Sequence, residues 1–194
     1  LKAMLKVSQY KNLTRAANKL NRSQTAITKA ISDLEDNLGV TLFDRSSIGM
    51  SPTIYGDTLA LRVAQVEREF QAAGEAYMDY KKTGRGYQTI PIFSMDISYK
   101  RLASFLALYE TKDISSAAKK LSITRAAIYN SIRQLEELLD LSLFEREPNG
   151  VRSTAFCAVL ARHIKLAFSQ IRHAIDDIAS IDGITVGRVA LGTL

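Results

Sequence analysis

Hydrophobic residues near the start of the chain recur at the spacing of amphipathic helices. A first such segment ends near Tyr10, a short second one ends at Leu20, and a third spans residues 24–38. Apolar side chains in the third segment lie three or four residues apart, so they form one buried stripe. These side chains are Ile27, Ile31, Leu34 and Leu38. The pattern therefore predicts three helices, the last of which turns polar and cationic side chains outward.

Capping residues and two short strands complete this predicted module. Thr14 and Ser23 are the expected N-caps of the second and third helices. Two helices joined by a turn of about three residues are typical of a helix-turn-helix. Beyond Gly39, residues 41–45 and 49–53 predict two short strands around a turn. We expect the hairpin that they form to be a wing.

The whole pattern repeats at an offset of 101 residues. Residues 1–62 align with residues 102–163 without a gap, and 20 of the 62 pairs are identical. Solenoid repeats run to about 50 residues, so each copy is predicted to be a small domain of its own. Ser115 and Thr124 are the expected caps in the second copy. Its buried stripe consists of Ile128, Ile132, Leu135 and Leu139.

A long helix with a regular apolar seam is predicted after each wing. Apolar residues alternate at spacings of four and three over residues 59–81 and at the aligned positions of residues 160–182, as in a coiled coil. A helix of about 35 Å that packed only on its own domain would leave much apolar surface uncovered, so pairing with another such helix is favoured. The seam residues are Leu59, Val63, Val66, Phe70 and Tyr77 in the first helix and Leu160, Ile164, Ile171 and Ile178 in the second.

The predicted fold class is therefore mainly α, with two tandem winged helix-turn-helix domains that are each followed by a long linker helix. We call the two winged domains the first and the second module. The expected divisions are 1–58 and 99–159 for the modules, 59–81 and 160–182 for the linker helices, and 82–98 for the connection.

Composition and charge narrow the class of protein. The chain has 194 residues, no apolar run near the ~20 residues of a membrane span, and one cysteine, which fits a soluble cytoplasmic protein. The net charge of +6 is uneven: residues 1–62 hold nine Lys and Arg against five Asp and Glu, whereas residues 102–163 hold eight against seven. This excess of positive charge in the first copy indicates a polyanionic partner.

Candidate catalytic and metal-binding residues are few. His163 and His173 stand ten residues apart, which is not the i, i+4 spacing of a helical metal pair. Cys157 occupies the place of Gly56 in the first copy, so packing is favoured over nucleophilic chemistry. We therefore expect no enzyme, no metal and no cofactor.

Two segments carry a resemblance to a known family. Residues 23–45, SQTAITKAISDLEDNLGVTLFDR, closely resemble the recognition helix and wing entry of LysR-type transcriptional regulators, and residues 124–146, TRAAIYNSIRQLEELLDLSLFER, are similar to them. The resemblance covers nearly the whole chain. It implies a bacterial transcriptional regulator that binds double-stranded DNA in a sequence-specific manner.

The resemblance directs attention to the outward face of helix 24–38. Ser23 and Gln24 match the family motif, whereas Thr25 stands where the family more often has proline. N-terminal residues of such a helix meet base edges in the major groove, where glutamine can pair with adenine, a threonine methyl can contact thymine, and lysine can reach guanine or a phosphate. The expected DNA-binding residues of the first module are Ser23, Gln24, Thr25, Thr28, Lys29 and Ser32.

The second module places other side chains at the equivalent positions. Arg125 and Asn130 are chemically able to read guanine and adenine, but the ring of Tyr129 can obstruct a close approach to the groove. Two alternatives stay open: a second reader with its own specificity, or a protein-interaction and assembly module in which the second copy is a scaffold without DNA contact. The candidate residues are Arg125, Tyr129, Asn130, Arg133 and, for a phosphate, Arg152 in the wing.

In this family the linker helices of two subunits pair antiparallel. The resemblance therefore implies that the two linker helices of this chain could pair with each other, without a second chain. The connection is able to span about 60 Å, so helices 59–81 and 160–182 could pair within one chain. We predict this intramolecular pseudo-dimer, with an asymmetric DNA site, and keep a dimer of two chains as the alternative. Residues 183–194 resemble the hinge and first strand of the family's effector-binding domain, which is missing here. A small-molecule inducer would bind only to that domain.

Overall fold

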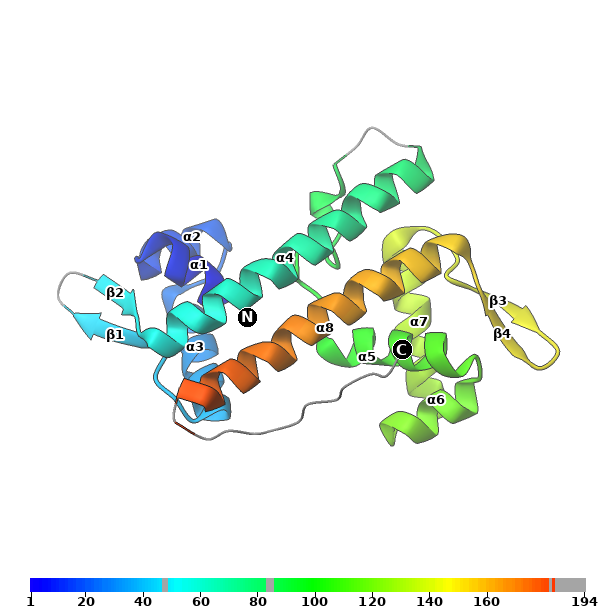
Figure 1. Cartoon of the computed structure of the whole chain (residues 1–194). Helices are drawn as coiled ribbons and strands as arrows, with labels where there is room; N and C mark the ends of the chain where they lie inside the picture. The colour runs from blue at the N-terminus through cyan, green and yellow to red at the C-terminus, as the bar shows by residue number, and fades with distance from the viewer. Residues whose placement is uncertain (47–48, 83–85, 182, 184–194) are drawn as a thin grey trace, which may run out of the picture. The chain divides into compact units, whose positions relative to one another are not determined.

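A computed structural model of the chain describes residues 1–46, 49–82, 86–181 and 183. The chain divides into two compact units (Figure 1): unit 1 comprises Leu1–Gln65 and Ser169–Leu194, and unit 2 comprises Val66–Phe168. Each unit therefore contains one winged module together with a part of each of the two long helices.

Unit 1 begins with three short helices that are followed by a two-stranded hairpin. The antiparallel hairpin pairs Phe43 with Pro52 and Ser46 with Gly49. The elements are α1 (Lys2–Tyr10), α2 (Leu13–Lys19), α3 (Gln24–Leu38), β1 (Phe43–Ser46), β2 (Gly49–Pro52) and the first part of α4 (Ile54–Lys81).

Unit 2 repeats this order of elements and adds a short 3-10 helix before it. Its hairpin pairs Phe144 with Ser153 in the same register. The elements are η1 (Tyr87–Thr89), α5 (Tyr99–Thr111), α6 (Ile114–Leu121), α7 (Arg125–Leu139), β3 (Phe144–Glu147), β4 (Gly150–Ser153) and the first part of α8 (Ala155–Ile181). The predicted fold class, mainly α with winged helix-turn-helix units, is confirmed.

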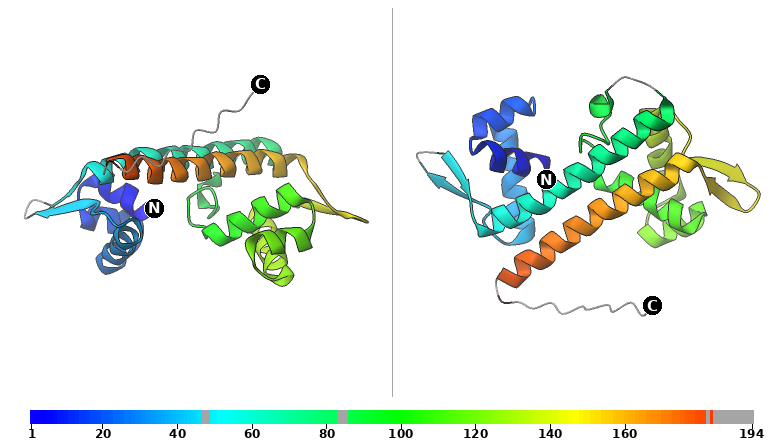
Figure 2. Two further views of the ribbon diagram at one scale, coloured as in Figure 1. Left: turned by 60° about the horizontal axis from the view of Figure 1, so that its bottom comes forward. Right: turned by 45° about the horizontal axis from the view of Figure 1, so that its top comes forward.

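The two long helices lie side by side and antiparallel within each unit. In unit 1, the Arg62 guanidinium on α4 bonds the Asp177 carboxylate on α8 at 2.7 Å. In unit 2, Nδ1 of His163 on α8 lies 2.8 Å from a carboxylate oxygen of Glu69 on α4. Within each unit the helix pair forms one layer, and the three-helix module packs against one face of it (Figure 2). Both helices begin directly after their wings, five residues before the expected starts.

The caps of α3 and α7 agree with the sequence, but those of α2 and α6 do not. Ser23 Oγ accepts the Ala26 N–H, and Thr124 Oγ1 accepts the Ala127 N–H, each at 3.1 Å. The expected caps Thr14 and Ser115 are wrong. Asn12 caps α2 and Asp113 caps α6, because both helices begin earlier and an Asx side chain stands directly before each.

The apolar stripes of α3 and α7 are not buried equally. All four stripe residues of α7 are buried, whereas Ile27 and Ile31 of α3 are buried and Leu34 and Leu38 are only half-buried. Ile92 and Phe93 of the connection are also buried in unit 2. Unit 1 has no counterpart of this segment among its described residues.

A glutamate on α3 and another on α7 each accept hydrogen bonds from the wing that follows. The Glu35 carboxylate accepts the Leu42 N–H at 2.7 Å and the Phe43 N–H at 3.3 Å. Glu136 accepts the equivalent N–H groups of Leu143 and Phe144 at 2.7 and 3.2 Å. Both glutamates lie at identical places in the two copies, so each module fixes the angle between helix and wing by the same contact.

No helix of the described residues is both long enough and apolar enough to cross a membrane.

We predict that Glu35→Ala destabilises the first module by roughly 1–3 kcal/mol, because two part-buried N–H groups lose their acceptor. Urea unfolding measures the effect. Asp36→Ala is the matched control, since Asp36 is an exposed neighbour on the same helix. Equal losses in the two variants would contradict a bracing role for Glu35.

Candidate nucleic-acid interface

The outer face of α3 exposes most of the residues that the sequence nominates. Gln24, Thr25, Lys29 and Ser32 are exposed, and Thr28 is half-buried. Ser23 is exposed as well, and its hydroxyl caps the helix. The first two turns of α3 therefore offer an amide, two threonines and an ammonium group to a ligand.

Gln24 is oriented by the preceding helix. Its Nε2 donates to Thr14 Oγ1 at 3.1 Å. An amide nitrogen carries two hydrogens, so the second N–H and the Oε1 oxygen are both left for a ligand. Those two groups are the ones that pair with N7 and N6 of adenine. Thr14, which the sequence suggested only as a cap, thus has a role in positioning Gln24.

Lys29 carries an ion pair that DNA can displace. Its Nζ lies 3.3 Å from Asp33 Oδ1, one turn along α3, and both side chains are more than half exposed. Such exposed i, i+4 pairs contribute only about 0.3–0.5 kcal/mol. The ammonium group can therefore exchange Asp33 for a phosphate or a base edge at low cost.

Arg45 is a candidate that the sequence argument did not single out. It lies on β1 and, with Thr28 and Met50, lines a shallow hollow between α3 and the wing. The signal was present in the sequence, because Arg146 stands at the aligned position of the second copy. Among the described residues, no carboxylate forms a salt bridge with Arg15, Lys19 or Arg45. The first module therefore keeps several cations available for phosphates.

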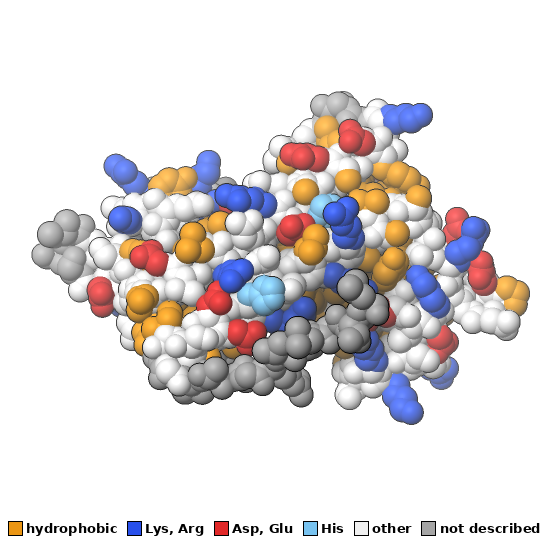
Figure 3. Space-filling view, viewed as in Figure 1, with side chains coloured by type: hydrophobic (Ala, Val, Ile, Leu, Met, Phe, Trp, Pro, Cys, Tyr) orange, Lys and Arg blue, Asp and Glu red, His pale blue; other side chains and the backbone are white. Residues whose placement is uncertain are grey.

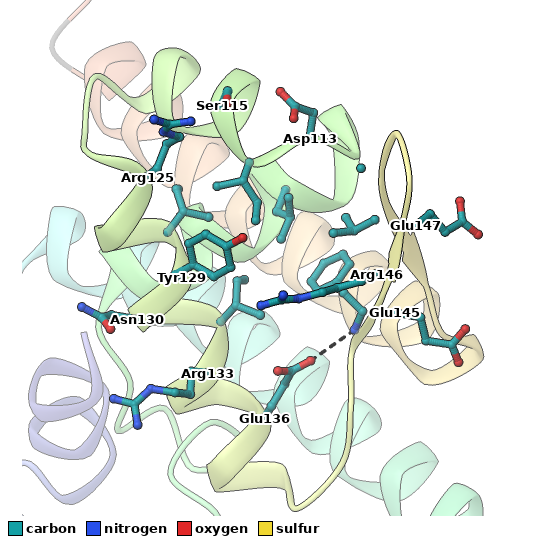
Figure 4. Close-up of a pocket in the computed structure, with 17 residues that line it drawn as sticks. Asp113, Ser115, Arg125, Tyr129, Asn130, Arg133, Glu136, Glu145, Arg146 and Glu147 are labelled. Carbon is teal, nitrogen blue, oxygen red and sulfur yellow. Dashed lines mark hydrogen bonds between the residues drawn. The ribbon is translucent and has the colours of Figure 1, made fainter.

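The same region of the second module is a larger hollow of about 610 Å³ between α6, α7 and the wing. Tyr129 points from α7 into this hollow, and Arg146 points into it from the wing (Figure 4). Arg125, Asn130 and Arg133 also line this hollow from α7 and are exposed. The Tyr129 ring, about half exposed, therefore occupies part of the space between helix and wing, beside the other candidate residues of the second module.

Carboxylates accompany the basic residues of the second module. Arg133 pairs with Glu137 at 2.9 Å. Arg152 bonds Glu145 and also lies 3.1 Å from Glu147, so its charge is balanced within the wing. Basic and acidic side chains stand next to one another at this wing in the space-filling view (Figure 3).

Asp113 adds a further negative charge near Arg125. The pKa of its carboxyl is lowered by hydrogen bonds from Ser116, and the charge of Arg125 lowers it further. The carboxylate therefore stays ionised at neutral pH and opposes the approach of a phosphate to Arg125.

The predicted seam residues lie on the buried faces of α4 and α8. All of them are buried except Ile171, which is half-buried. Polar contacts flank the seam in each unit: Arg62 also donates to Gln170 at 3.1 Å in unit 1, and His163 bonds Glu69 in unit 2. His163 therefore flanks the seam.

Cys157 shows none of the features of a catalytic nucleophile. It is buried, and this burial raises the pKa of its thiol to about 12. The aligned position of the first module is tight, because a Cβ added at Gly56 would lie 2.1 Å from the Leu42 carbonyl oxygen. Within the described part of the chain, no three His, Cys, Asp or Glu side chains are placed to hold a metal ion.

Comparisons with known proteins extend the resemblance. The family model described as "Bacterial regulatory helix-turn-helix protein, lysR family" matches residues 1–57 and 99–158. The transcriptional regulator GalR of Pseudomonas putida is 27% identical over 194 residues, which is 100% of this chain and 47% of the relative. CfxR of Cupriavidus necator is 26% identical over 185 residues, 94% of this chain and 56% of the relative. PcaQ of Agrobacterium fabrum is 31% identical over 83 residues, 43% of this chain and 27% of the relative.

The chain thus spans about half the length of the two relatives that it matches over most of its own length. No solved structure matched it significantly. The relatives named above are transcriptional regulators, which agrees with the expectation that the chain is not an enzyme. Because the family model covers more than half of the residues, in both modules, the chain belongs to the lysR family of bacterial regulatory helix-turn-helix proteins.

Proposed function

We propose that the chain binds double-stranded DNA in a sequence-specific manner, as the DNA-binding part of a cytoplasmic transcriptional regulator. The observation that carries this proposal is the exposed first turn of α3, where Thr14 holds Gln24 with its pairing groups turned to solvent. In this proposal the N-terminal turn of α3 enters the major groove. Arg45 on the wing and Arg15 and Lys19 on α2 supply the cations for the phosphate backbone.

The two modules contribute unequally in this proposal. The first module supplies most of the electrostatic affinity, because carboxylates pair with Arg133 and Arg152 in the second. Arg125 and Asn130 are exposed and chemically competent, so the second module reads a different half-site with weaker phosphate contacts. The DNA site is accordingly asymmetric. Relatives of about twice this length suggest that an inducer, where there is one, acts on a part of the protein outside this chain.

We also propose that one chain forms the pseudo-dimer, with α4 and α8 as the pairing helices. The contacts of Arg62 with Asp177 and of Glu69 with His163 support the proposal, because each joins the two helices of a single chain. The burial of the seam residues in the single chain supports it as well. A second chain would have to displace these contacts in order to pair with either helix.

Substitutions on α3, and one at Thr14 of α2, test the proposal that α3 reads the DNA sequence. Gln24→Ala is expected to cost roughly 1–3 kcal/mol of discrimination between the preferred duplex and a single-base variant. Thr14→Val, which removes only the acceptor that orients Gln24, is expected to lose part of the same discrimination. Lys29→Ala is expected to lower the affinity for both duplexes equally and to reduce the slope of log K against log salt by about 1.

These α3 variants are measured by titration of duplexes first selected from a random pool. Equal, weak binding of the wild-type chain to all duplexes would refute sequence-specific recognition and leave assembly as the function. If Gln24→Ala and Lys29→Ala exchange their effects, the helix has been placed in the groove incorrectly.

The second wing is tested by charge removal. Arg152→Ala is expected to change DNA affinity by less than twofold, because Glu145 and Glu147 already balance its charge. The double variant Glu145→Gln/Glu147→Gln is expected to raise the affinity and to steepen the salt slope by about 1. The control, Glu75→Gln/Asp79→Asn, removes the same charge at exposed positions of α4. Equal gains in both double variants would show that only net charge matters.

Sedimentation tests the single-chain pseudo-dimer. At micromolar concentration we expect one species with the mass of a single chain, 21.5 kDa. Arg62→Ala should leave this mass unchanged, because the buried seam residues still join α4 and α8 within the chain. An obligate dimer with no detectable monomer would contradict intramolecular pairing of α4 and α8.

A further inference from the structure

The C-terminal end of the second reading helix is held by side chains of α4. The Tyr77 hydroxyl on α4 donates to the carbonyl oxygen of Leu139, the last residue of α7, at 2.8 Å. This hydrogen bond is buried. The carbonyl groups at the end of a helix have no partner within it, so Tyr77 satisfies one of them from a different element.

Lys81 continues this contact one turn further along α4. Its Nζ donates to the Asp140 carbonyl oxygen at 2.6 Å and to Asp140 Oδ2 at 3.0 Å. A cation at the C-terminus of a helix also interacts favourably with the helix dipole. The hydrogen bond to Asp140 raises the pKa of Lys81, so the ammonium form persists at neutral pH. Two side chains of α4 therefore bond the carbonyl of the last residue of α7, Leu139, and that of its C-cap residue, Asp140.

Tyr87 and Phe93 of the connection pack against the same end of α4. The ring of Tyr87 lies against Gly74, where an added Cβ would come within 2.2 Å of it. Phe93 is buried and lies 5.4 Å from the Tyr77 ring and 5.9 Å from the Tyr87 ring. Phe156, at the start of α8, meets Tyr77 from another side at 5.6 Å. Tyr77 thus lies in an aromatic cluster that leaves its hydroxyl little freedom of direction.

The first module lacks the side chain for this hold. Ile178 of α8 aligns with Tyr77 and has no hydroxyl, and Leu38, the end of α3, is only half-buried where Leu139 is buried. The connection itself occurs once, between the two modules. The hold is therefore a property of this chain's second module and not of the repeated unit.

We propose that Tyr77 and Lys81, together with Tyr87 and Phe93 of the connection, form a clamp that fixes the direction of α7 on α4, and that Tyr77 and Lys81 are positioning residues for DNA reading by the second module. The proposal rests on the proposed function, since it assumes that α7 reads a half-site. α4 is one continuous helix that begins directly after the first wing. A rigid joint at its far end sets the half-site spacing that the chain accepts.

Spacing is the property that a joint controls. One added base pair moves a half-site by about 3.4 Å and rotates it by about 35° around the duplex. A clamped α7 cannot follow that shift without breaking the caps on Leu139 and Asp140. A loosened α7 can follow it, at the cost of weaker binding at the best spacing.

The experiment compares two double variants with matched controls. Tyr77→Phe/Lys81→Met removes the caps and keeps the ring contacts and the aliphatic stem. Tyr80→Phe/Lys82→Met makes the same chemical changes at exposed neighbours for which no cap of α7 is seen. Each protein is titrated with duplexes whose two selected half-sites are separated by the best spacer or by one or two base pairs more or less.

We expect the wild-type chain and the control to lose at least tenfold in affinity at the wrong spacings. The clamp variant should lose less than threefold there, while it still binds every two-part duplex more tightly than the first half-site alone. An unchanged spacing preference overturns the proposal. Binding that falls to the level of the first half-site overturns it too, because the second module would then have lost its fold and not its direction.

Amide hydrogen exchange without DNA separates this inference from the proposed function. Exchange at the C-terminal turn of α7 should be at least tenfold faster in the clamp variant than in the control. Equal exchange in the two variants overturns the clamp, whatever the DNA titrations show. If the wild-type chain binds a two-part duplex no better than the first half-site, reading by the second module fails, and the exchange result still decides whether the clamp exists.

Discussion

The apolar seams of α4 and α8 constrain everything else in this chain. Full burial of a Val, Leu, Ile or Phe side chain contributes about 1.5–3 kcal/mol, so neither helix can leave its seam in water. Within each unit the other long helix and the winged module cover the seam, and Val63 and Ile164 are almost completely buried. The modules are therefore attached to the helix layer by the same surface that joins the helices. A movement of α3 or α7 relative to the helix layer would therefore disturb this buried surface.

A shared frame with different surfaces explains how two copies can do different work. Glu35 and Glu136 make the same pair of hydrogen bonds at the same distances, so the angle between helix and wing is kept. The side chains that such a frame presents are exposed and can change without loss of stability. Thr28 of the first copy aligns with Tyr129 of the second. The second wing balances its own charges, whereas in the first wing Arg45 has no acidic partner among the described residues.

Local patterns predicted the elements well, and long-range contacts lay beyond them. The stripes of α3 and α7 and the caps Ser23 and Thr124 depend on neighbours within four residues, which a sequence displays directly. Thr14 and Ser115 were misread because Asn12 and Asp113 are equally good caps two residues earlier. The orientation of Gln24 by Thr14 and the bond from Tyr77 to Leu139 join elements that only tertiary packing brings together. The 82–98 segment resembled a tether for the same reason, since nothing local shows that Ile92 and Phe93 have a cavity to fill.

Firm attachment of the weaker module is physically reasonable in this arrangement. A module with few available cations gains little from phosphate contacts, which tolerate small displacements because they are made by flexible side chains. It must rely on base contacts, and these require the reading helix to stand within a fraction of an ångström of its target. A joint that moves would lose part of that binding energy as conformational entropy. The first module, with Arg15, Lys19 and Arg45 available, can bind from a less tightly held helix end, where Leu34 and Leu38 remain half-buried. Under the proposed function, the clamp on α7 and the neutral wing of the second module follow from one division of labour, in which the first copy supplies attraction and the second supplies geometry.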